Sequence, residues 1–273
     1  MSLFNSGDSA MRMNWMAALV LGLLVSACAG VQTAPTQEEK LALAPTGKLR
    51  GAFFANQPAH ATKDPVSGEP KGIAIDLGKE LARRLGVPFE PVTYPTPSAL
   101  AGSIASGQWD IIFTGIIPGR AKELNISAPY VQIEIGYLVA KGGSISDISD
   151  ADKPGARIGV LRSGATDVLL THSLKAATLV RTPTIAAAVD MVRSGKADAV
   201  AAVKTVLYPI TDRVPGLQVL EGRIAAEDIG IGVPKERAAG ANYVRKVVDE
   251  LKATGFVKAA VERAGVRGVV AVP

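Results

Sequence analysis

Residue types that commonly carry catalytic or metal chemistry are scarce in this 273-residue sequence. It contains one cysteine, Cys28, and two histidines, His60 and His172. A single cysteine cannot form a disulfide within the chain, and this set is too small for a zinc finger or a His/Cys metal cluster. Neither histidine has a neighbouring acid or nucleophile motif, so we expect both at the surface. The sequence therefore predicts no metal site, no cofactor and no catalytic residue.

The overall composition excludes several further classes of protein. Hydrophobic residues make up 48% of the sequence and charged residues 20%, which excludes a disordered chain. The formal net charge is +5, with no run of basic residues longer than a pair, so nucleic-acid binding is not favoured. There is one long apolar run, which excludes a multi-span membrane protein. Residues 159–166 are not a phosphate-binding P-loop, because Ala165 stands where that loop needs a lysine.

Cys28 directly follows the apolar run. Residues 16–27 read MAALVLGLLVSA, which is too short to span a bilayer and ends in small residues, as secretory signal peptides do. The end of this run and Cys28 resemble a bacterial lipobox. The resemblance implies removal of residues 1–27 and lipid attachment to Cys28. Residues 28–47 contain several threonines and prolines with little periodicity, which predicts a flexible tether. The alternative is an ordinary buried or membrane-embedded cysteine.

From residue 48 onward, strand-like runs alternate with helical patterns, which predicts the α/β class with mostly parallel strands. Strands are expected at residues 49–54, 71–75, 88–94, 109–113, 133–140, 157–161 and 197–203. Helices are expected at residues 77–85, 98–106, 165–175, 185–194, 242–253 and 256–264. Asp76 and Thr184 are placed to cap two of these helices.

Two short segments recur at matching places, each between an expected helix and an expected strand. They read GQWD at residues 107–110 and GKAD at residues 195–198. This similarity predicts two lobes of related topology.

A series of motifs runs through the same part of the chain. They are KGIAIDL at residues 71–77, SGQWD at 106–110, Gly115 with Arg120, SAPY at 127–130, IGVLRSG at 158–164 and GKADAV at 195–200. Their order and spacing resemble the bacterial extracellular solute-binding proteins of family 3, the receptors of polar amino-acid ABC transporters. The resemblance covers residues 48–265.

The resemblance implies a two-lobed clamp of the type II periplasmic-binding-protein class, each lobe a mostly parallel sheet flanked by helices. Both ends of the chain would form lobe 1, which we place at residues 48–138 and 228–273, with lobe 2 at residues 142–222. Extended crossings at residues 136–140 and 223–232 would form the hinge. A ligand would bind between the lobes and close them by hinge motion.

Arg120 is the first ligand-binding residue that the resemblance implies. In the family, an arginine that follows a glycine at a strand end holds the ligand's carboxylate as a bidentate fork. Thr114 and Gly115 offer backbone amides beside it. The family's usual hydroxyl residue is replaced here by Ile117, and the loop before Arg120 is shorter than usual. The alternative is a solvated arginine in a surface loop.

The resemblance implies two further groups of contacts. The loop that closes over the ligand from lobe 2 corresponds to Arg162, Ser163, Gly164 and Thr166. Arg162 stands where the family often has lysine, and would contact the ligand or pair across the closed cleft. After the first strand, Phe53 and Asn56 lie where an aromatic residue packs on the ligand. At most one of Phe53 and Phe54 faces the cleft, because neighbouring strand residues alternate sides.

The family's ammonium-binding aspartate is replaced here by Val203, with Lys204 next. Enclosing an ammonium group there without a carboxylate would cost several kcal/mol of desolvation. Either another acid substitutes, with Glu134, Glu227 and Asp228 as candidates, or the ligand is an organic acid without an amino group. Lys204 would either face the cleft or be a solvated residue that caps a helix.

These features together predict a lipid-anchored receptor, facing the periplasm, that delivers a small carboxylate-bearing solute such as an amino acid to an ABC importer. The implied partners are the importer's permease and ATPase subunits, and we expect a monomer. Two alternatives stay open. One is a periplasmic cyclohexadienyl-dehydratase-like enzyme on the same fold, for which Glu134 is the acid to test. The other is a module that presents its ligand to a separate sensor.

Overall fold

The computed structural model describes residues 34–54, 57–64, 66–162 and 164–273. The chain divides into two units, and the second, Pro35–Pro273, is described below. The predicted contacts Asn56 and Ser163 and the predicted lipid-bearing Cys28 lie outside the described residues. Within the described ranges, no helix combines the length and apolarity needed to cross a membrane.

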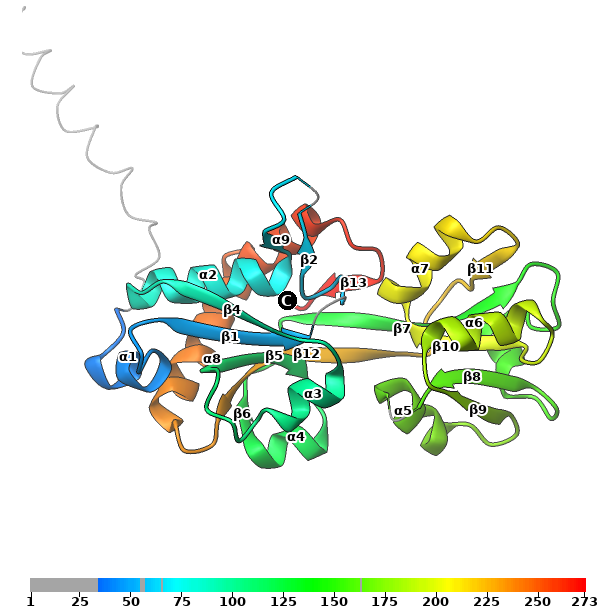
Figure 1. Cartoon of the computed structure of the whole chain (residues 1–273), viewed down its shortest axis with the longest axis horizontal. Helices are drawn as coiled ribbons and strands as arrows, with labels where there is room; N and C mark the ends of the chain where they lie inside the picture. Colours follow the sequence, from blue (N-terminus) through cyan, green and yellow to red (C-terminus); the bar gives the residue numbers. More distant parts are fainter. Residues whose placement is uncertain (1–33, 55–56, 65, 163) are drawn as a thin grey trace, which may run out of the picture. The chain divides into compact units, whose positions relative to one another are not determined.

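A mixed sheet runs through the second unit (Figure 1). Its strands follow the order β4-β1-β5-β12-β7-β10-β8-β9, with β6, β11 and β13 paired at its sides. The main strands are β1 (Leu49–Phe54), β4 (Phe89–Tyr94), β5 (Ile111–Gly115), β7 (Val131–Ala140), β8 (Arg157–Leu161), β9 (Thr178–Thr182), β10 (Ala199–Val203) and β12 (Ala225–Pro234). The side strands are β6 (Leu124–Ile126), β11 (Leu217–Val219) and β13 (Val269–Ala271), while β2 (Thr62–Lys63) and β3 (Pro70–Lys71) form a separate pair.

Parallel pairing forms two groups of strands at opposite ends of this order. β1 is parallel to β4 and β5, and β8 is parallel to β9 and β10. Between the groups, β12 and β7 pair antiparallel with each other and with their outer neighbours β5 and β10. Figure 1 shows these two long strands running from one group to the other. The predicted α/β class with mostly parallel strands is confirmed within each group.

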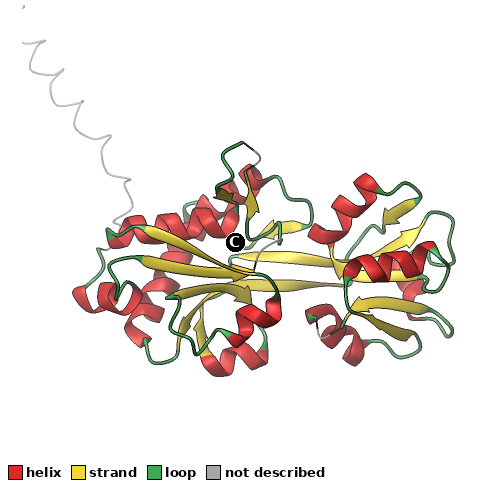
Figure 2. Ribbon diagram, in the orientation of Figure 1, coloured by secondary structure: helices red, strands yellow, loops and turns green. Residues whose placement is uncertain are grey.

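Helices cover the strands of both groups (Figure 2). They are α1 (Gln37–Leu43), α2 (Ile73–Leu85), α3 (Pro97–Gly102), α4 (Pro118–Glu123), α5 (Ala165–Ser173), α6 (Ile185–Arg193), α7 (Lys204–Arg213), α8 (Ala238–Ala253) and α9 (Phe256–Ala264), with a 3₁₀ turn at Ile148–Asp152. The predicted helix over residues 256–264 matches α9, and Thr184 caps α6 as predicted by accepting a hydrogen bond from the Ala187 amide.

Helix α1 corrects the prediction of a flexible tether over residues 28–47. Thr36 and Glu39 form a reciprocal capping box at its start, in which each side chain accepts a hydrogen bond from the other's backbone amide. At its end, the Leu43 side chain is fully buried and packs beside Gly240 of α8. The tether prediction therefore fails over residues 37–43, because a local cap and a buried anchor hold this segment on the domain.

The start of α2 differs from the sequence prediction as well. The helix begins at Ile73 with Gly72 as its N-cap, so Asp76 lies in the first turn and pairs with Arg263 rather than capping the helix. The strand expected at residues 71–75 is reduced to β3. Gly72 adopts a φ of 141°, and a Cβ there would lie 2.7 Å from the His60 carbonyl oxygen. This close approach requires glycine and fixes where the helix begins.

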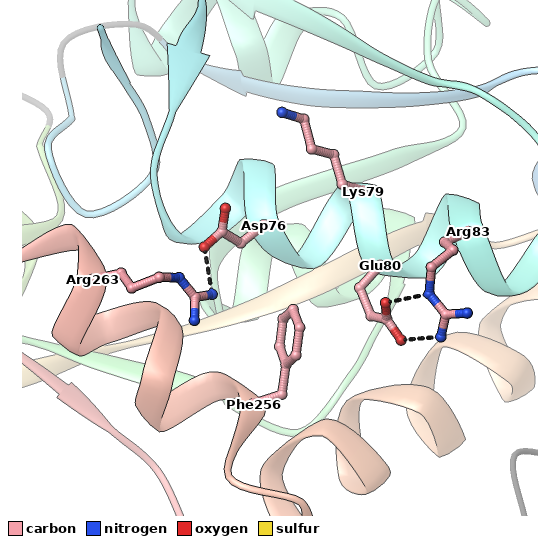
Figure 3. Close-up of a pocket in the computed structure, with 6 residues that line it drawn as sticks. All are labelled: Asp76, Lys79, Glu80, Arg83, Phe256 and Arg263. Atoms are coloured by element: carbon pink, nitrogen blue, oxygen red, sulfur yellow. Dashed lines mark hydrogen bonds and ion pairs between the residues drawn. The ribbon is translucent and has the colours of Figure 1, made fainter.

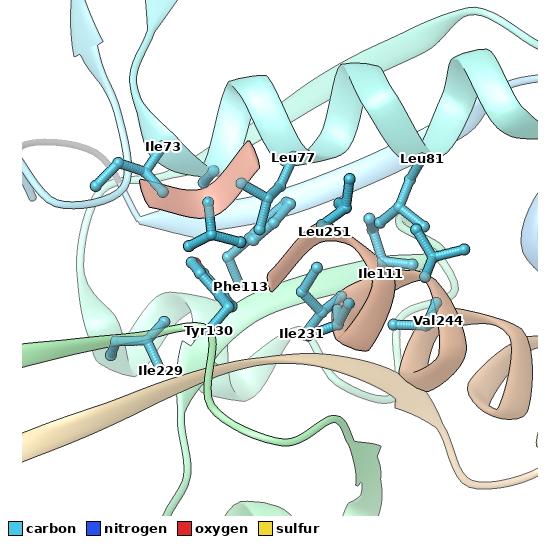
Figure 4. Packing of buried hydrophobic residues seen from close by; sticks show 14 of the residues in the cluster. Ile73, Leu77, Leu81, Ile111, Phe113, Tyr130, Ile229, Ile231, Val244 and Leu251 are labelled. Carbon is cyan, nitrogen blue, oxygen red and sulfur yellow. The ribbon is translucent and has the colours of Figure 1, made fainter. Parts of the chain in front are cut away.

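The hydrophobic core divides along the same lines as the parallel strands. We call α1 to β6, together with α8, α9 and β13, the terminal region, and β8 to β11 with α5 to α7 the central region. In the terminal region, one cluster joins α2 to β5, β12 and α8 (Figure 4). In the central region, alternate residues of β10 belong to two different clusters, one on each face of the sheet. Each region therefore has hydrophobic packing of its own.

Candidate functional site

Arg120 lies where β5 ends and α4 begins. Pro118 occupies the first turn of α4, a position that suits proline because its missing amide would have no helical partner there. Arg120 therefore lies on a short helix instead of in a loop. Its Nη1 donates to the Thr114 hydroxyl, and lies 3.5 Å from the Gly115 carbonyl oxygen. The guanidinium is partly buried against the end of β5, so the alternative of a solvated surface arginine is wrong.

Glu227 approaches the same point from β12. The antiparallel ladder between β12 and β5 pairs Ile229 with Gly115, so Glu227 lies just past its end. A Cβ on residue 115 would be 2.4 Å from Glu227 Oε1 and 3.5 Å from Arg120 Nη1. Only the absence of a side chain at Gly115 allows both charged groups to lie over this stretch of backbone.

Burial sets the electrostatics of this group, which we call the β5-end site: Thr114, Gly115, Arg120 and Glu227. Burial raises the pKa of the Glu227 carboxyl, and the nearby positive charge of Arg120 lowers it in part. Burial lowers the pKa of Arg120, although a guanidinium remains charged at any physiological pH. Two opposite charges are thus held close together in a poorly solvated place, where a small ligand with charges of its own would interact strongly.

His60 lies close to the β5-end site and is buried, contrary to the expectation of a surface residue. Its side chain is 3% exposed, and its carbonyl oxygen accepts a hydrogen bond from the Ala74 amide at the start of α2. Burial, with a smaller contribution from the charge of Arg120, lowers the pKa of His60 to about 4. The imidazole is therefore neutral at pH 7. His172, on α5, is exposed as expected.

Among the remaining predicted contacts of the terminal region, Phe53 does not reach a ligand surface. Its side chain is 1% exposed and belongs to the main hydrophobic cluster together with Phe113 and Tyr130. The structure makes Phe53 a core residue, which the strict alternation of strand side chains leaves open from the sequence alone.

The Arg162 group lies in the central region, at the turn from β8 into α5. Arg162 is exposed, and its amide donates to the Thr182 carbonyl oxygen at 2.9 Å. Gly164 is the N-cap of α5, and Thr166 is buried in the first turn of that helix. Among the described residues, no hydrogen bond or ion pair joins this group to the β5-end site.

Lys204, next to Val203, is buried. The alternative of a solvated residue is therefore wrong. The side chain is 5% exposed, and its Nζ lies 3.2 Å from Glu134 Oε2 on β7. Two glycines make room for it: a Cβ on Gly136 would lie 2.8 Å from Lys204 Cε, and one on Gly268 would lie 2.7 Å from Lys204 Cβ. The charge of Lys204 is therefore already neutralised, and it is not available to hold an anionic ligand.

Surface hollows also lie elsewhere on the described part of the domain, and two of them lie between helices. The first, of about 240 Å³ between α2 and α9, is lined by Asp76, Lys79, Glu80, Arg83, Phe256 and Arg263 (Figure 3). Its acids are already paired with arginines at 2.8 Å, Asp76 with Arg263 and Glu80 with Arg83. The second, of about 700 Å³, lies between α1 and the start of α8. A charged ligand would have to separate existing ion pairs in the first hollow, so the β5-end site is a better candidate than that hollow.

The described residues contain no cluster of three or more histidine, cysteine or acidic side chains placed to hold a metal ion. The β5-end site thus offers charge recognition and hydrogen bonding to a ligand, with one cationic and one carboxyl group on the two sides of a bare stretch of backbone.

Known proteins share both the sequence pattern and the fold. Residues 54–265 match the bacterial extracellular solute-binding proteins, family 3. The chain is 25% identical over 200 residues to the ABC transporter glutamine-binding protein GlnH of Bacillus subtilis (strain 168), covering 71% of this chain and 72% of that protein. Among solved structures, a solute receptor for L-cysteine of Neisseria gonorrhoeae superposes with a TM-score of 0.68 at 25% identity, covering 84% of this chain and 95% of that one.

A further solved structure bears on the enzyme alternative. It is an ancestral amino acid-binding protein, AncCDT-1, a precursor of cyclohexadienyl dehydratase, and it superposes with a TM-score of 0.66 at 25% identity over 84% of this chain and 99% of that one. The relatives are named for binding, which supports a binding protein over an enzyme. With its family match and its type II periplasmic-binding-protein fold, the chain belongs to the bacterial extracellular solute-binding proteins of family 3.

Proposed function

We propose that this protein captures an amino acid and delivers it to the permease and ATPase subunits of an ABC importer. The observation that carries the proposal is the Arg120 guanidinium, held partly buried over the end of β5 by Thr114. A planar guanidinium in that setting binds a carboxylate strongly, because it donates two parallel hydrogen bonds in a poorly solvated place. The named relatives bind glutamine and L-cysteine, which share an α-carboxylate.

We further propose the two-lobed organisation predicted from the sequence, with lobe 1 at residues 48–138 and 228–273 and lobe 2 at residues 142–222. The separate hydrophobic clusters of the terminal and central regions support it, as do β7 and β12, which pair with strands of both. The ligand would be held at the β5-end site, and the segment from Arg162 to Thr166 would close on it from the other lobe.

The place of action that we propose rests on the N-terminal sequence. A signal peptide over residues 1–27 and a lipid on Cys28 would hold the receptor on a membrane surface of the cell envelope, outside the cytoplasm. Extracellular action accords with the family as a whole. The monomeric state is part of the same proposal.

No observation favours the dehydratase alternative. Glu134, the acid that the sequence offers for such chemistry, is engaged by Lys204.

The proposal is tested by titrating the purified protein with each of the twenty L-amino acids, following its thermal midpoint and then the heat of binding. We expect at least one amino acid to stabilise the protein. Arg120→Gln should weaken its binding by about 100-fold or more, because truncating one partner of a buried, hydrogen-bonded charge pair costs roughly 2–5 kcal/mol. Arg181→Gln, which removes an arginine that pairs with Asp167 in the central region, is the control and should bind normally. A wild-type protein that responds to no amino acid would contradict the proposal.

A further inference from the structure

Three acids were candidates to replace the missing aspartate at Val203, and the structure separates them. Glu134 is paired with Lys204 at 3.2 Å. Asp228 accepts a hydrogen bond from Gln132 Nε2 at 2.8 Å. The Glu227 carboxylate has no hydrogen-bond or ion-pair partner among the described residues, although its backbone pairs with β7.

The strand geometry explains why the adjacent acids Glu227 and Asp228 have different neighbours. Successive side chains of a strand point to opposite faces, so Glu227 and Asp228 cannot both face the end of β5. Asp228 points toward Gln132 of β7, while Glu227 Oε1 lies over Gly115, beside Arg120. The Ile116 amide donates to the Asp228 carbonyl oxygen at 2.8 Å, which fixes β12 against β5 at this point. The position of Glu227 is therefore set by the backbone of two strands and not by a flexible loop.

Arg120 and Glu227 carry opposite charges but form no direct ion pair in the described part of the chain. Arg120 is instead turned onto Thr114 and the Gly115 carbonyl oxygen. A carboxylate without a partner in a poorly solvated place is unfavourable, and burial accordingly raises its pKa. The site thus lacks one cationic hydrogen-bond donor next to Glu227 and one anionic acceptor next to Arg120.

We propose that Glu227 binds the α-ammonium group of the ligand, and that the β5-end site selects zwitterionic amino acids over carboxylic acids that lack the amino group. The carboxylate of the ligand would lie on Arg120 and its ammonium group on Glu227, with the bare backbone of Gly115 between them. This inference rests on the proposed function, because it assigns the second contact of the same ligand. The ammonium-binding acid would then lie on β12, in the proposed hinge crossing, and not at the end of β10.

The test compares each L-amino acid that stabilises the wild-type protein with the acid that lacks only its amino group, such as L-glutamine with 4-carbamoylbutanoate or L-arginine with 5-guanidinopentanoate. Calorimetric affinities give the preference ratio of each pair. We expect the wild-type protein to prefer the amino acid by about 100-fold or more, and Glu227→Gln to reduce this ratio at least tenfold. The deaminated acid should bind the variant at least as well as the wild type.

Asp228→Asn is the matched control, because it neutralises the adjacent carboxylate on the opposite face of the same strand. It should keep the wild-type ratio. Glu227→Gln should not lower the thermal midpoint of the ligand-free protein, because removing an unpaired buried charge relieves a cost of folding. Circular dichroism and that midpoint report whether the variant is folded.

The outcomes separate the inference from the function on which it rests. If Glu227→Gln folds and keeps the preference for amino acids, or if the wild type prefers the deaminated acids, the assignment of Glu227 is wrong while solute binding stands. If the wild type binds neither member of any pair, the proposed function fails and the inference with it.

Discussion

The terminal and central regions contain the same ion pair at equivalent places, with different surroundings. In the terminal region, Arg50 at the start of β1 donates to Asp110 from its backbone amide and its guanidinium, at 2.9–3.0 Å. In the central region, Arg157 at the start of β8 donates to Asp198 in the same way, at 2.8–3.0 Å. Each aspartate ends one of the two recurring sequence segments. In each region, the pair therefore joins the first strand to the strand that follows the repeated turn.

Burial and a third partner distinguish the two pairs. The Asp110 side chain is fully buried and accepts a further hydrogen bond from Arg237, which joins β12 to α8. The same Arg237 also donates to the Ala42 carbonyl oxygen of α1. The Asp198 side chain is 20% exposed, and that of Arg157 is 41% exposed. The same ion pair thus joins several segments in the terminal region. In the central region it is partly exposed to water and joins two strands.

The largest effect that we predict comes from neutralising Asp110, the buried one of the two aspartates. Asp110→Asn should lower the free energy of unfolding by about 3–5 kcal/mol, because it removes the charge of a fully buried carboxylate that two arginines share. Asp198→Asn should cost only about 1 kcal/mol, since water can replace much of what is lost. Urea denaturation of both variants, followed by circular dichroism, measures the difference.

Equal losses at the two aspartates would contradict this account, since they would mean that burial does not set the strength of the pair. Because the second unit contains two hydrophobic regions, the unfolding curves should be checked for separate transitions. A transition confined to one region would itself show which pair holds which region together.

The two histidines extend the comparison to pH, with a smaller expected effect. His60 is buried in the terminal region with a pKa of about 4, below its ordinary value of 6.5. Between these values the unfolded chain binds a proton that the folded protein does not, so this contribution to stability is lost as the pH falls from 6.5 toward 4. The loss should approach about 3 kcal/mol. Glu227, whose pKa is raised, acts in the opposite direction over its own range.

Unfolding measured at pH 7 and pH 4.5 spans the range of His60, and the acids whose pKa values are lowered by arginine partners, such as Glu80 at about 2, titrate mainly below this window. Glu227 acts in the same window, so the histidine is identified by comparing variants with the wild-type protein. His60→Gln should remove much of the acid sensitivity of the wild-type protein, and His172→Gln, at an exposed position on α5, should not change it. Unchanged acid sensitivity in His60→Gln would show that another group is responsible.

Local sequence signals predicted the fold well. The alternation of strands and helices, the repeated turns and the cap at Thr184 each depend on residues close together in the chain, and the structure confirms them. Gly107 and Gly195 adopt φ angles of 67° and 68°, as the equivalence of the two segments requires. Arg120 was singled out by the resemblance to the family, and its contact with a ligand is a proposal.

The state of single side chains at the site was predicted poorly, because it depends on pairing between distant segments. Nothing near His60 in the sequence shows that α2 begins against its backbone. The burial of Lys204 requires Gly136 of β7 and Gly268 near β13 on two sides of it. Glu227 was one of three possible acids until the ladder between β12 and β5 placed it over Gly115. The glycines at 115, 136 and 268 were the available signals, but they gain meaning only with the topology.

The smallest predicted effects lie at two equivalent helix caps, where burial should make no difference. Thr96 caps α3 and Thr184 caps α6, each by accepting a hydrogen bond from the amide three residues on at 3.1 Å, and both are exposed. Alanine at either position should lower the free energy of unfolding by about 1 kcal/mol, and serine should restore it. The same urea titrations measure both. Equal losses at the caps beside unequal losses at Asp110 and Asp198 would show that the two regions share their local chemistry and differ in what covers it. Unequal losses at the caps would instead point to a general difference in stability between the regions, and the contrast between the aspartates would then need no special role for burial.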